Sequence, residues 1–302
     1  MNKKNIFIYT ICGLVVSLFA VSLALAAKPK IVNTSKGHAV VKIPARAVEV
    51  SPGIFNLGTA LHNGEVVEGY AVFKRKEGFG KIKAVCGNGV CERKENAVKC
   101  PADCGGGEDP PVPPEPDTSS CYEFLAKGAK WKTVEPYIVN PANIRGLDEA
   151  FVADNLDADI SKWELVAGVD ILGEGSVTGA VLEADMVAPD YQNEVYFGDI
   201  EEPDVIAMAV VWGIFGGPPK FRKLVEWDMI FNEADYDWSA SGEAGKMDFE
   251  SIATHELGHA VGMGDLYTSE CAEMTMYGYA SNGETKKRTL EDGDINGAQE
   301  LY

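Results

Sequence analysis

The sequence predicts an α+β fold with a linker between its parts, and three features lead to that expectation. Residues 28–85 contain short runs typical of β-strands, such as HAVVKIPARAVEV and EVVEGYAVFKR, separated by glycine and asparagine turns. Near the other end, MDFESIATHELGHAVG repeats apolar residues at helical spacing from Phe249 to Ala260. Between them, GGGEDPPVPPEPDTSS at residues 105–120 has the composition of a linker that is semi-extended where proline dominates.

The first 27 residues have the pattern of a secretory signal sequence. Lys3 and Lys4 precede an apolar run, and the small residues from Ala24 to Ala27 supply a cleavage site. An apolar run of this length can also remain uncleaved as a membrane anchor, which is the alternative. No later stretch has 18 consecutive apolar residues, so we expect a secreted chain without a stable membrane partner once the signal is cleaved.

The cysteines also indicate an oxidising compartment. Cys12 lies in the signal sequence, which leaves an even number in the exported chain. Four of them crowd into CGNGVCERKENAVKCPADC, a piece too short to bury a core, so we expect two disulfides there, with a four-cysteine zinc site as the alternative. The other two, Cys121 and Cys271, bracket the last domain, and we predict a disulfide between them. The clustered cysteines, whose pairing stays open, are Cys86, Cys91, Cys100 and Cys104.

These signals divide the chain into consecutive parts. They are a signal sequence at 1–27, a small β-rich segment and possible propeptide at 28–85, a disulfide module at 86–104, a linker at 105–120 and a large domain at 121–302.

Charge is distributed unevenly over these parts. The last domain has 12 Lys and Arg against 35 Asp and Glu, a net charge of −23, and the first 120 residues have 15 against 11, a net charge of +4. The sum is the −19 of the whole chain. Because nucleic acids are bound through Lys and Arg at their phosphates, this balance argues against a nucleic-acid partner.

The stretch THELGHAVGMGD, residues 254–265, gathers metal-binding side chains on one helix. His255 and His259 are four residues apart, so their imidazoles lie on one helix face and can bind one ion. Asp248 suits the N-cap position of this helix, and Gly262 suits its end.

Two carboxylates complete the pattern. Asp265 follows the expected helix end closely enough to supply a third ligand, and Glu256 suits a base that acts on metal-bound water. Two nitrogens, one carboxylate oxygen and an open fourth position are what a catalytic zinc site needs. The alternative is a core helix with two incidental histidines, and the presence of both Gly262 and Asp265 weighs against it.

The motif H-E-x-x-H-x-x-G-x-x-D resembles the zinc-binding motif of the metzincin endopeptidases, which a methionine-containing turn follows. Met276, in TMYGYAS, is similar to the methionine of that turn, with a plain core methionine as the alternative. The ending RTLEDGDINGAQELY and the stretch VEPYIVNPANIRGLDEAFVADNLDADISKWE are similar to the matrixin branch of this group. Residues 121–302 are thereby identified as a matrixin-like catalytic domain.

This resemblance implies a fold and an activity. The expected domain has a twisted, mostly parallel sheet with one antiparallel edge strand, long helices and a zinc ion in a cleft between two lobes. The expected activity is hydrolysis of peptide bonds in extended polypeptides, with zinc on His255, His259 and Asp265 and with Glu256 as general base. The substrate is expected to pair with the edge strand near residues 226–232.

The chain also departs from the matrixin pattern. Most matrixins use a histidine as third ligand, whereas Asp265 resembles the snapalysin-like metzincins, and residues 121–302 contain no third histidine. EWDMIFNEADYDW resembles the edge strand beside the cleft, where a histidine usually helps to bind a structural zinc. Ile230 stands there, so no structural zinc is expected. The acidic cluster that follows, Glu233, Asp235 and Asp237, suits either a calcium site or a solvated surface.

Two other classes of function remain open. One is a secreted binding or structural protein built on a peptidase-like domain, which the intact Glu256 argues against. The other is hydrolysis of a substrate other than protein, which the methionine turn and the matrixin-like ending make less favourable. We take the chain to act as a monomer on a polypeptide substrate.

Overall fold

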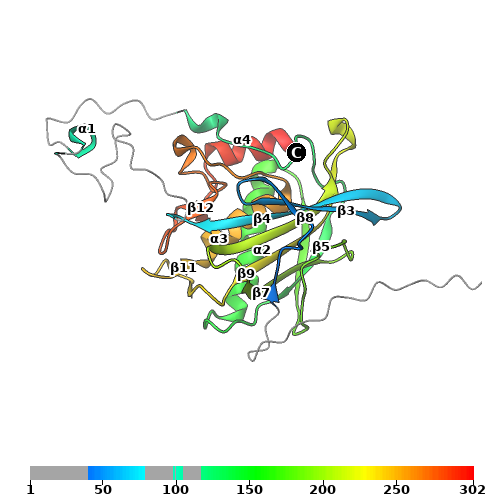
Figure 1. Ribbon diagram of the computed structural model, residues 1–302, viewed down its shortest axis with the longest axis horizontal. Coiled ribbons are helices and arrows are strands. Elements are labelled where there is room, and N and C mark those ends of the chain that lie inside the picture. The colour runs from blue at the N-terminus through cyan, green and yellow to red at the C-terminus, as the bar shows by residue number, and fades with distance from the viewer. Residues whose placement is uncertain (1–39, 79–97, 99, 105–116) are drawn as a thin grey trace, which may run out of the picture. The chain divides into compact units, whose positions relative to one another are not determined.

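The computed structural model describes residues 40–78, 98, 100–104 and 117–302 (Figure 1). The predicted signal sequence at 1–27 and most of the predicted linker lie outside these residues. Among the helices that are described, none has the length and hydropathy needed to span a membrane.

A mixed sheet organises the domain that follows the linker. Its strands run in the order β6, β5, β7, β9, β8. The first four are parallel to one another, and β8 is antiparallel to β9. The mostly parallel sheet with an antiparallel strand on one side is therefore as predicted. The bounds are β5 at Glu135–Asn140, β6 at Leu172–Val177, β7 at Asn193–Ile200, β8 at Val205–Ile214 and β9 at Lys223–Asn232.

The prediction that residues 226–232 form the edge strand is wrong. These residues belong to β9, which pairs in parallel with β7 on one side and antiparallel with β8 on the other. Because both rows of its backbone groups are used, β9 cannot accept an added strand. The strand in the edge position of this domain is β8.

The β-like runs of the N-terminal segment that are described, within residues 40–78, continue this same sheet. β4 pairs antiparallel with β8, β3 with β4 and β2 with β3 (Figure 1). The bounds are β2 at Val48–Ser51, β3 at Ile54–His62 and β4 at Glu65–Lys76.

Four short strands complete the pairing. β1 at Val40–Val41 pairs with β7, and β12 at Tyr279–Ala280 pairs in parallel with β4. β10 at Trp238–Ser239 and β11 at Met247–Asp248 pair with each other just before the metal-binding motif.

Three helices of more than two turns are described, and each begins with a capping residue. Asp148 caps the first of them by accepting a hydrogen bond from the Phe151 N–H at 2.9 Å, and Gly168 ends it in the left-handed conformation. The expected closing helix is formed and starts with a capping box at Glu291 and Asp294. The helices are α1 at Pro101–Cys104, α2 at Glu149–Ala167, α3 at Phe249–Val261 and α4 at Asp292–Leu301, and the 3-10 turns are Thr118–Ser120, Pro219–Phe221, Ser269–Cys271 and Lys286–Arg288.

The main core lies between the sheet and the helices α2 and α3. Phe249 at the start of α3 packs against Phe231 of β9, with ring centroids 4.8 Å apart. Trp163 of α2 is fully buried, and its indole N–H donates to the Thr254 carbonyl of α3 at 2.9 Å. These contacts fix α3, which carries the metal-binding motif, against the middle of the sheet.

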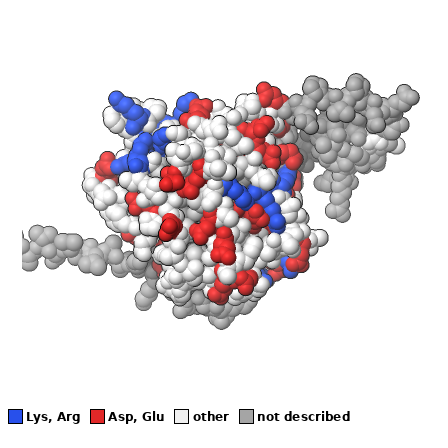
Figure 2. Space-filling view, turned by 180° about the vertical axis from the view of Figure 1, so that it is seen from behind, with Lys and Arg blue, Asp and Glu red and all other residues white. Residues whose placement is uncertain are grey.

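Acidic side chains are spread over the face of the molecule in Figure 2, and Lys and Arg form only a few separate groups there. This agrees with the net charge of −19. The expectation that no nucleic acid binds stays a prediction.

Candidate metal centre

The helix α3 begins and ends where the sequence predicts. Asp248 accepts a hydrogen bond from the Ser251 N–H at 3.0 Å and so acts as the N-cap. Gly262 ends the helix with a φ of 108°, a conformation that side chains disfavour. A Cβ at Gly262 would also lie 2.8 Å from the Ala129 carbonyl, so only glycine fits this turn. The turn sends the chain back towards the histidines.

Three predicted ligands converge as a result. Nε2 of His255 lies 3.2 Å from Oδ1 of Asp265, and Nε2 of His259 lies 3.6 Å from the same oxygen. All three residues are buried, and their ligand atoms lie within 4.8 Å of one another. This is the spacing of donor atoms that can surround one ion.

Hydrogen bonds on the far side of each ring fix the tautomers. Nδ1 of His255 lies 2.7 Å from the Thr275 carbonyl oxygen, and Nδ1 of His259 lies 3.0 Å from that of Met263. Because a carbonyl oxygen only accepts, each Nδ1 carries the proton and donates. The lone pair of each Nε2 is then directed at the shared centre, as a metal ligand requires.

The donor atoms at this centre fit a metal ion. Among the described residues, neither Nε2 atom, nor Oδ1 of Asp265, nor either carboxylate oxygen of Glu256 has a hydrogen-bond partner. Buried polar atoms are rarely left without a partner, because each such atom costs about 1–3 kcal/mol. Two imidazole nitrogens and one carboxylate are ligands that zinc favours.

The protonation states support the same conclusion. Burial, with Lys74 next in effect, lowers the pKa of His255 to about 3, and burial also lowers the pKa of His259. Burial raises the pKa of Asp265, but the two histidines outweigh it and bring that pKa to about 2. Near neutral pH the site therefore offers two neutral imidazoles and an ionised carboxylate.

Glu256 lies within this buried region and has the properties of a base. Its side chain is 0% exposed, and burial raises its pKa well above the ordinary value, with Lys74 opposing that shift. A carboxylate with a raised pKa takes up a proton more readily than a solvated one.

The methionine turn lies directly beneath α3. Met276 is 0% exposed, and a Cβ at Gly258 of α3 would overlap its sulfur atom. Thr275, next to Met276, supplies the carbonyl that holds His255. The turn therefore sets the position of a predicted ligand through the backbone of Thr275.

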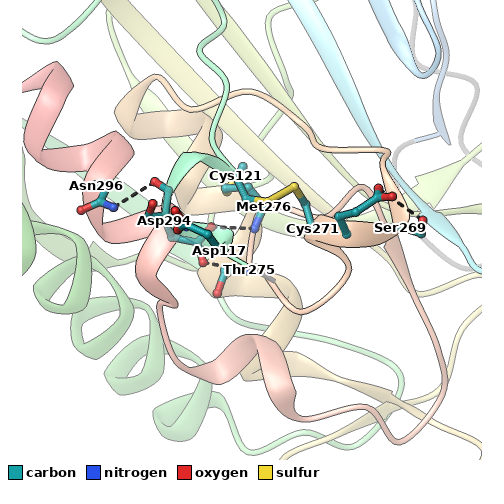
Figure 3. Close-up of a disulfide and its surroundings, with 10 residues drawn as sticks. Asp117, Cys121, Ser269, Cys271, Thr275, Met276, Asp294 and Asn296 are labelled. Carbon is teal, nitrogen blue, oxygen red and sulfur yellow. Dashed lines mark hydrogen bonds between the residues drawn. A yellow bond between two sulfur atoms is a disulfide. The ribbon is translucent and has the colours of Figure 1, made fainter. Parts of the chain in front are cut away.

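The predicted disulfide between Cys121 and Cys271 is formed, with 5.6 Å between the two Cα atoms (Figure 3). It ties the start of the domain to the loop between Asp265 and Met276. Cys100 and Cys104 are also disulfide-bonded. The other two cysteines of the module, Cys86 and Cys91, lie outside the described residues, so the pairing within the module stays open.

Comparison with known proteins shows which family the end of the chain resembles. Residues 216–302, which include the whole site, match the sequence profile of the matrixins. This part of the chain is matrixin-like. The match contains the motif, the methionine turn and the closing helix on which the resemblance was based.

The match to one relative covers more of the chain than residues 216–302. Metalloendoproteinase 5-MMP of Arabidopsis thaliana is 35% identical over 203 residues, which are 61% of this chain and 49% of that protein. Matrilysin of Homo sapiens is 39% identical over 75 residues, 25% of this chain and 26% of its own length. The chain thus spans about half or less of the relatives it matches. The likeness to the matrixins supports a zinc metalloendopeptidase, and calcium is usual in that family as well.

The acidic cluster considered for calcium, Glu233, Asp235 and Asp237, is engaged with protein groups. Glu233 accepts a hydrogen bond from the Ile144 N–H at 2.7 Å, and Asp237 pairs with Arg145 at 2.8 Å. In the described part of the chain, the three acids whose ligand atoms lie within 4.8 Å of one another are Asp185, Asp190 and Glu226, which are not this cluster. Calcium stays a prediction.

Sequence reasoning missed residues that support the metal centre. Lys74 of β4 reaches His255, and Asp294 of α4 holds the methionine turn. Tyr267 donates a hydrogen bond to Oδ2 of Asp265 at 3.0 Å. Only Tyr267 is near the motif in sequence, so it alone had a local signal, a hydroxyl two residues after the third ligand.

Proposed function

We propose that this protein is a secreted zinc-dependent endopeptidase that hydrolyses peptide bonds in extended polypeptides. The observation that carries the proposal is the convergence of Nε2 of His255, Nε2 of His259 and Oδ1 of Asp265 in a buried site beside Glu256. The matrixin match and the identity to Metalloendoproteinase 5-MMP support the same activity class.

Each residue of the site would have its own role in hydrolysis. His255, His259 and Asp265 would hold zinc, which makes water more acidic and polarises a carbonyl group. Glu256 would take a proton from the attacking water and give it to the departing amine, a role that requires only hydrogen-bond reach. The proton on Nδ1 of His255 stays on the ring, because the Thr275 carbonyl accepts it as a hydrogen bond.

Secretion is part of the proposal and is supported by cysteine chemistry. The signal pattern at 1–27 directs export, and a disulfide between Cys121 and Cys271 is stable in an oxidising compartment.

The test compares wild-type protein with Glu256→Gln, both loaded with zinc, on an unfolded protein substrate. Glutamine keeps the shape of Glu256 but cannot take up the proton, so we expect cleavage to fall 10²–10⁴-fold while bound zinc stays at one per chain. Asp265→Ala serves as the ligand variant and should lose zinc itself. Equal cleavage by wild type and Glu256→Gln would overturn the role of Glu256.

A zinc-loaded wild type that cleaves no polypeptide would favour the alternative of a binding protein built on a peptidase-like domain.

A further inference from the structure

The strand β6 is the last strand at one end of the sheet. Within the described residues it pairs with β5 on one side, and no strand pairs with its other side. The Thr178 N–H, just past the end of β6, donates to the Val139 carbonyl of β5 at 2.9 Å. Because alternate residues of a strand direct their backbone groups to opposite sides, those of Gly175 and Val177 are directed away from β5. The outer side of β6 therefore offers backbone donors and acceptors.

The composition of β6 leaves this edge open to pairing. Edge strands are commonly protected by lysine or proline, which discourage the addition of another strand. The sequence of β6, LGEGSV, contains neither of them, and its one charged side chain is Glu174. Val177 is 65% exposed. An exposed apolar side chain on a strand with outward backbone groups suits contact with a second chain.

A cavity of about 380 Å³ lies beside this edge, between β6 and α2. It is lined by two acids of α2, Asp157 and Glu164, and by Glu174 of β6, and no Lys, Arg or His is among its lining residues. The buried side chains Ile160 and Leu172 add apolar walls. This combination suits a lysine or arginine side chain, whose methylene groups pack on apolar surface while the charged end meets carboxylates.

Hydrogen bonds hold the two acids of α2 in place. Oδ1 of Asp157 accepts one from the Tyr137 hydroxyl at 2.6 Å. Oε1 of Glu164 accepts two, from the N–H groups of Ile171 at 2.8 Å and Leu172 at 3.0 Å. These bonds use one oxygen of each carboxylate, so the other oxygen can accept from an incoming cation. Carboxylates that are already fixed lose little freedom when a ligand binds.

We infer that the outer edge of β6 docks an extended segment, rich in Lys or Arg, of another polypeptide. The segment adds to the sheet as a strand and places one basic side chain in the cavity between β6 and α2. Main-chain hydrogen bonds to the edge supply affinity, and the cavity supplies specificity. The net charge of −23 over residues 121–302 favours a basic partner over an acidic one.

This surface is separate from the metal centre and goes beyond the proposed hydrolysis. In the strand order of the domain, β6 and β8 stand at opposite ends. None of the predicted zinc ligands lines the cavity. Docking at β6 therefore needs neither zinc nor the general base.

The first test removes the charge of the cavity. A fluorescein-labelled peptide of alternating lysine and valine is titrated against the full chain carrying Glu256→Gln, and fluorescence anisotropy is recorded. Adding Asp157→Asn and Glu164→Gln keeps the hydrogen-bond acceptors but removes two negative charges, so we expect binding to weaken about tenfold or more. Glu149→Gln with Asp154→Asn is the matched control. It removes two exposed acids of the same helix that do not line the cavity, and it should bind like the parent.

The second test blocks the edge without changing charge. Val177→Pro removes an outward N–H that makes no bond to β5, and we expect it to weaken peptide binding about tenfold or more. Val177→Thr keeps this N–H and should bind like the parent. Hydrogen exchange of the parent covers the case that Val177→Pro fails to fold. Bound peptide should slow the exchange of the Gly175 and Val177 amides.

The outcomes decide between strand addition and attraction by charge alone. Weaker binding in both the acid-pair and proline variants, together with slower exchange of the Gly175 and Val177 amides, supports the inference. Unchanged exchange of these two amides in the presence of saturating peptide would overturn it, because the peptide would then be held by charge without pairing to β6. Binding that neither variant weakens would also overturn it, since the peptide would then occupy another surface.

Discussion

The carboxylate of Asp294 accepts a hydrogen bond from the backbone N–H of Met276 at 3.1 Å (Figure 3). Its second oxygen accepts one from the Thr275 N–H at 2.8 Å. Asp294 also closes the capping box at the start of α4. One buried side chain therefore joins the closing helix to the turn whose Thr275 carbonyl holds His255, and it links the end of the chain to the metal centre.

Replacing Asp294 should disturb both stability and metal binding. Asp294→Ala leaves two buried backbone N–H groups without an acceptor. We therefore expect the free energy of unfolding to fall by about 3 kcal/mol or more. Because the turn positions the Thr275 carbonyl, zinc affinity should fall about tenfold or more. Asp292→Ala, at an exposed position in the same helical turn, is the control. Chemical denaturation and a zinc competition assay measure the two effects, and equal zinc affinity in the two variants would contradict the link.

Gly258 is the point at which the methionine turn touches α3. A Cβ there would overlap the sulfur of Met276 and approach Trp163 to 2.9 Å. We expect Gly258→Ala to destabilise the fold by about 1–3 kcal/mol through overpacking, although alanine is the better helix former. Gly179→Ala, where a Cβ would meet no atom within 4 Å, should be close to neutral. Thermal unfolding compares the two variants. A Gly258→Ala protein as stable as the control would show that the methionine turn shifts to make room for the added methyl group.

The sequence predicted the metal centre because its signals are local. The cap, the histidine pair, the glycine and the aspartate lie within residues 248–265, and short-range helix geometry brings them together. The wrong position of the edge strand has a long-range cause. β8 and β9 are both buried almost throughout, so their composition does not reveal which neighbours they have. Lys74 lies 181 residues from His255 in sequence, and only the strand order places it there.

The disulfide between Cys121 and Cys271 should contribute strongly to stability because it closes a long loop. The two cysteines are 150 residues apart, and removing a native disulfide typically costs about 2–5 kcal/mol. We expect the Cys121→Ser, Cys271→Ser double variant to unfold at lower denaturant concentration by that amount. The comparison is made under oxidising conditions in the Glu256→Gln background, which prevents self-digestion. A change below about 1 kcal/mol would mean that the reduced chain is constrained by other contacts.

Asp159 makes the stability of the fold depend on pH, and a single substitution can separate this effect from others. Its side chain is 0% exposed in α2, and burial raises its pKa to about 7, although Lys162 donates a hydrogen bond to it at 2.6 Å. A raised pKa means that the folded protein binds the proton more tightly than the unfolded chain. The stability from this proton is therefore fully present below the ordinary pKa of 3.8 and is lost as pH rises through about 7.

Asp159→Asn removes this proton and should remove its pH dependence. At 1.36 kcal/mol per pKa unit, wild type should lose about 3 kcal/mol relative to Asp159→Asn between pH 5 and pH 9. Asp154→Asn, exposed on the same helix, is the control and should follow wild type. Unfolding free energies are measured across this range in the Glu256→Gln background. Parallel curves for wild type and Asp159→Asn would mean that Asp159 stays ionised against Lys162, and that this ion pair outweighs the cost of burying its charge in α2.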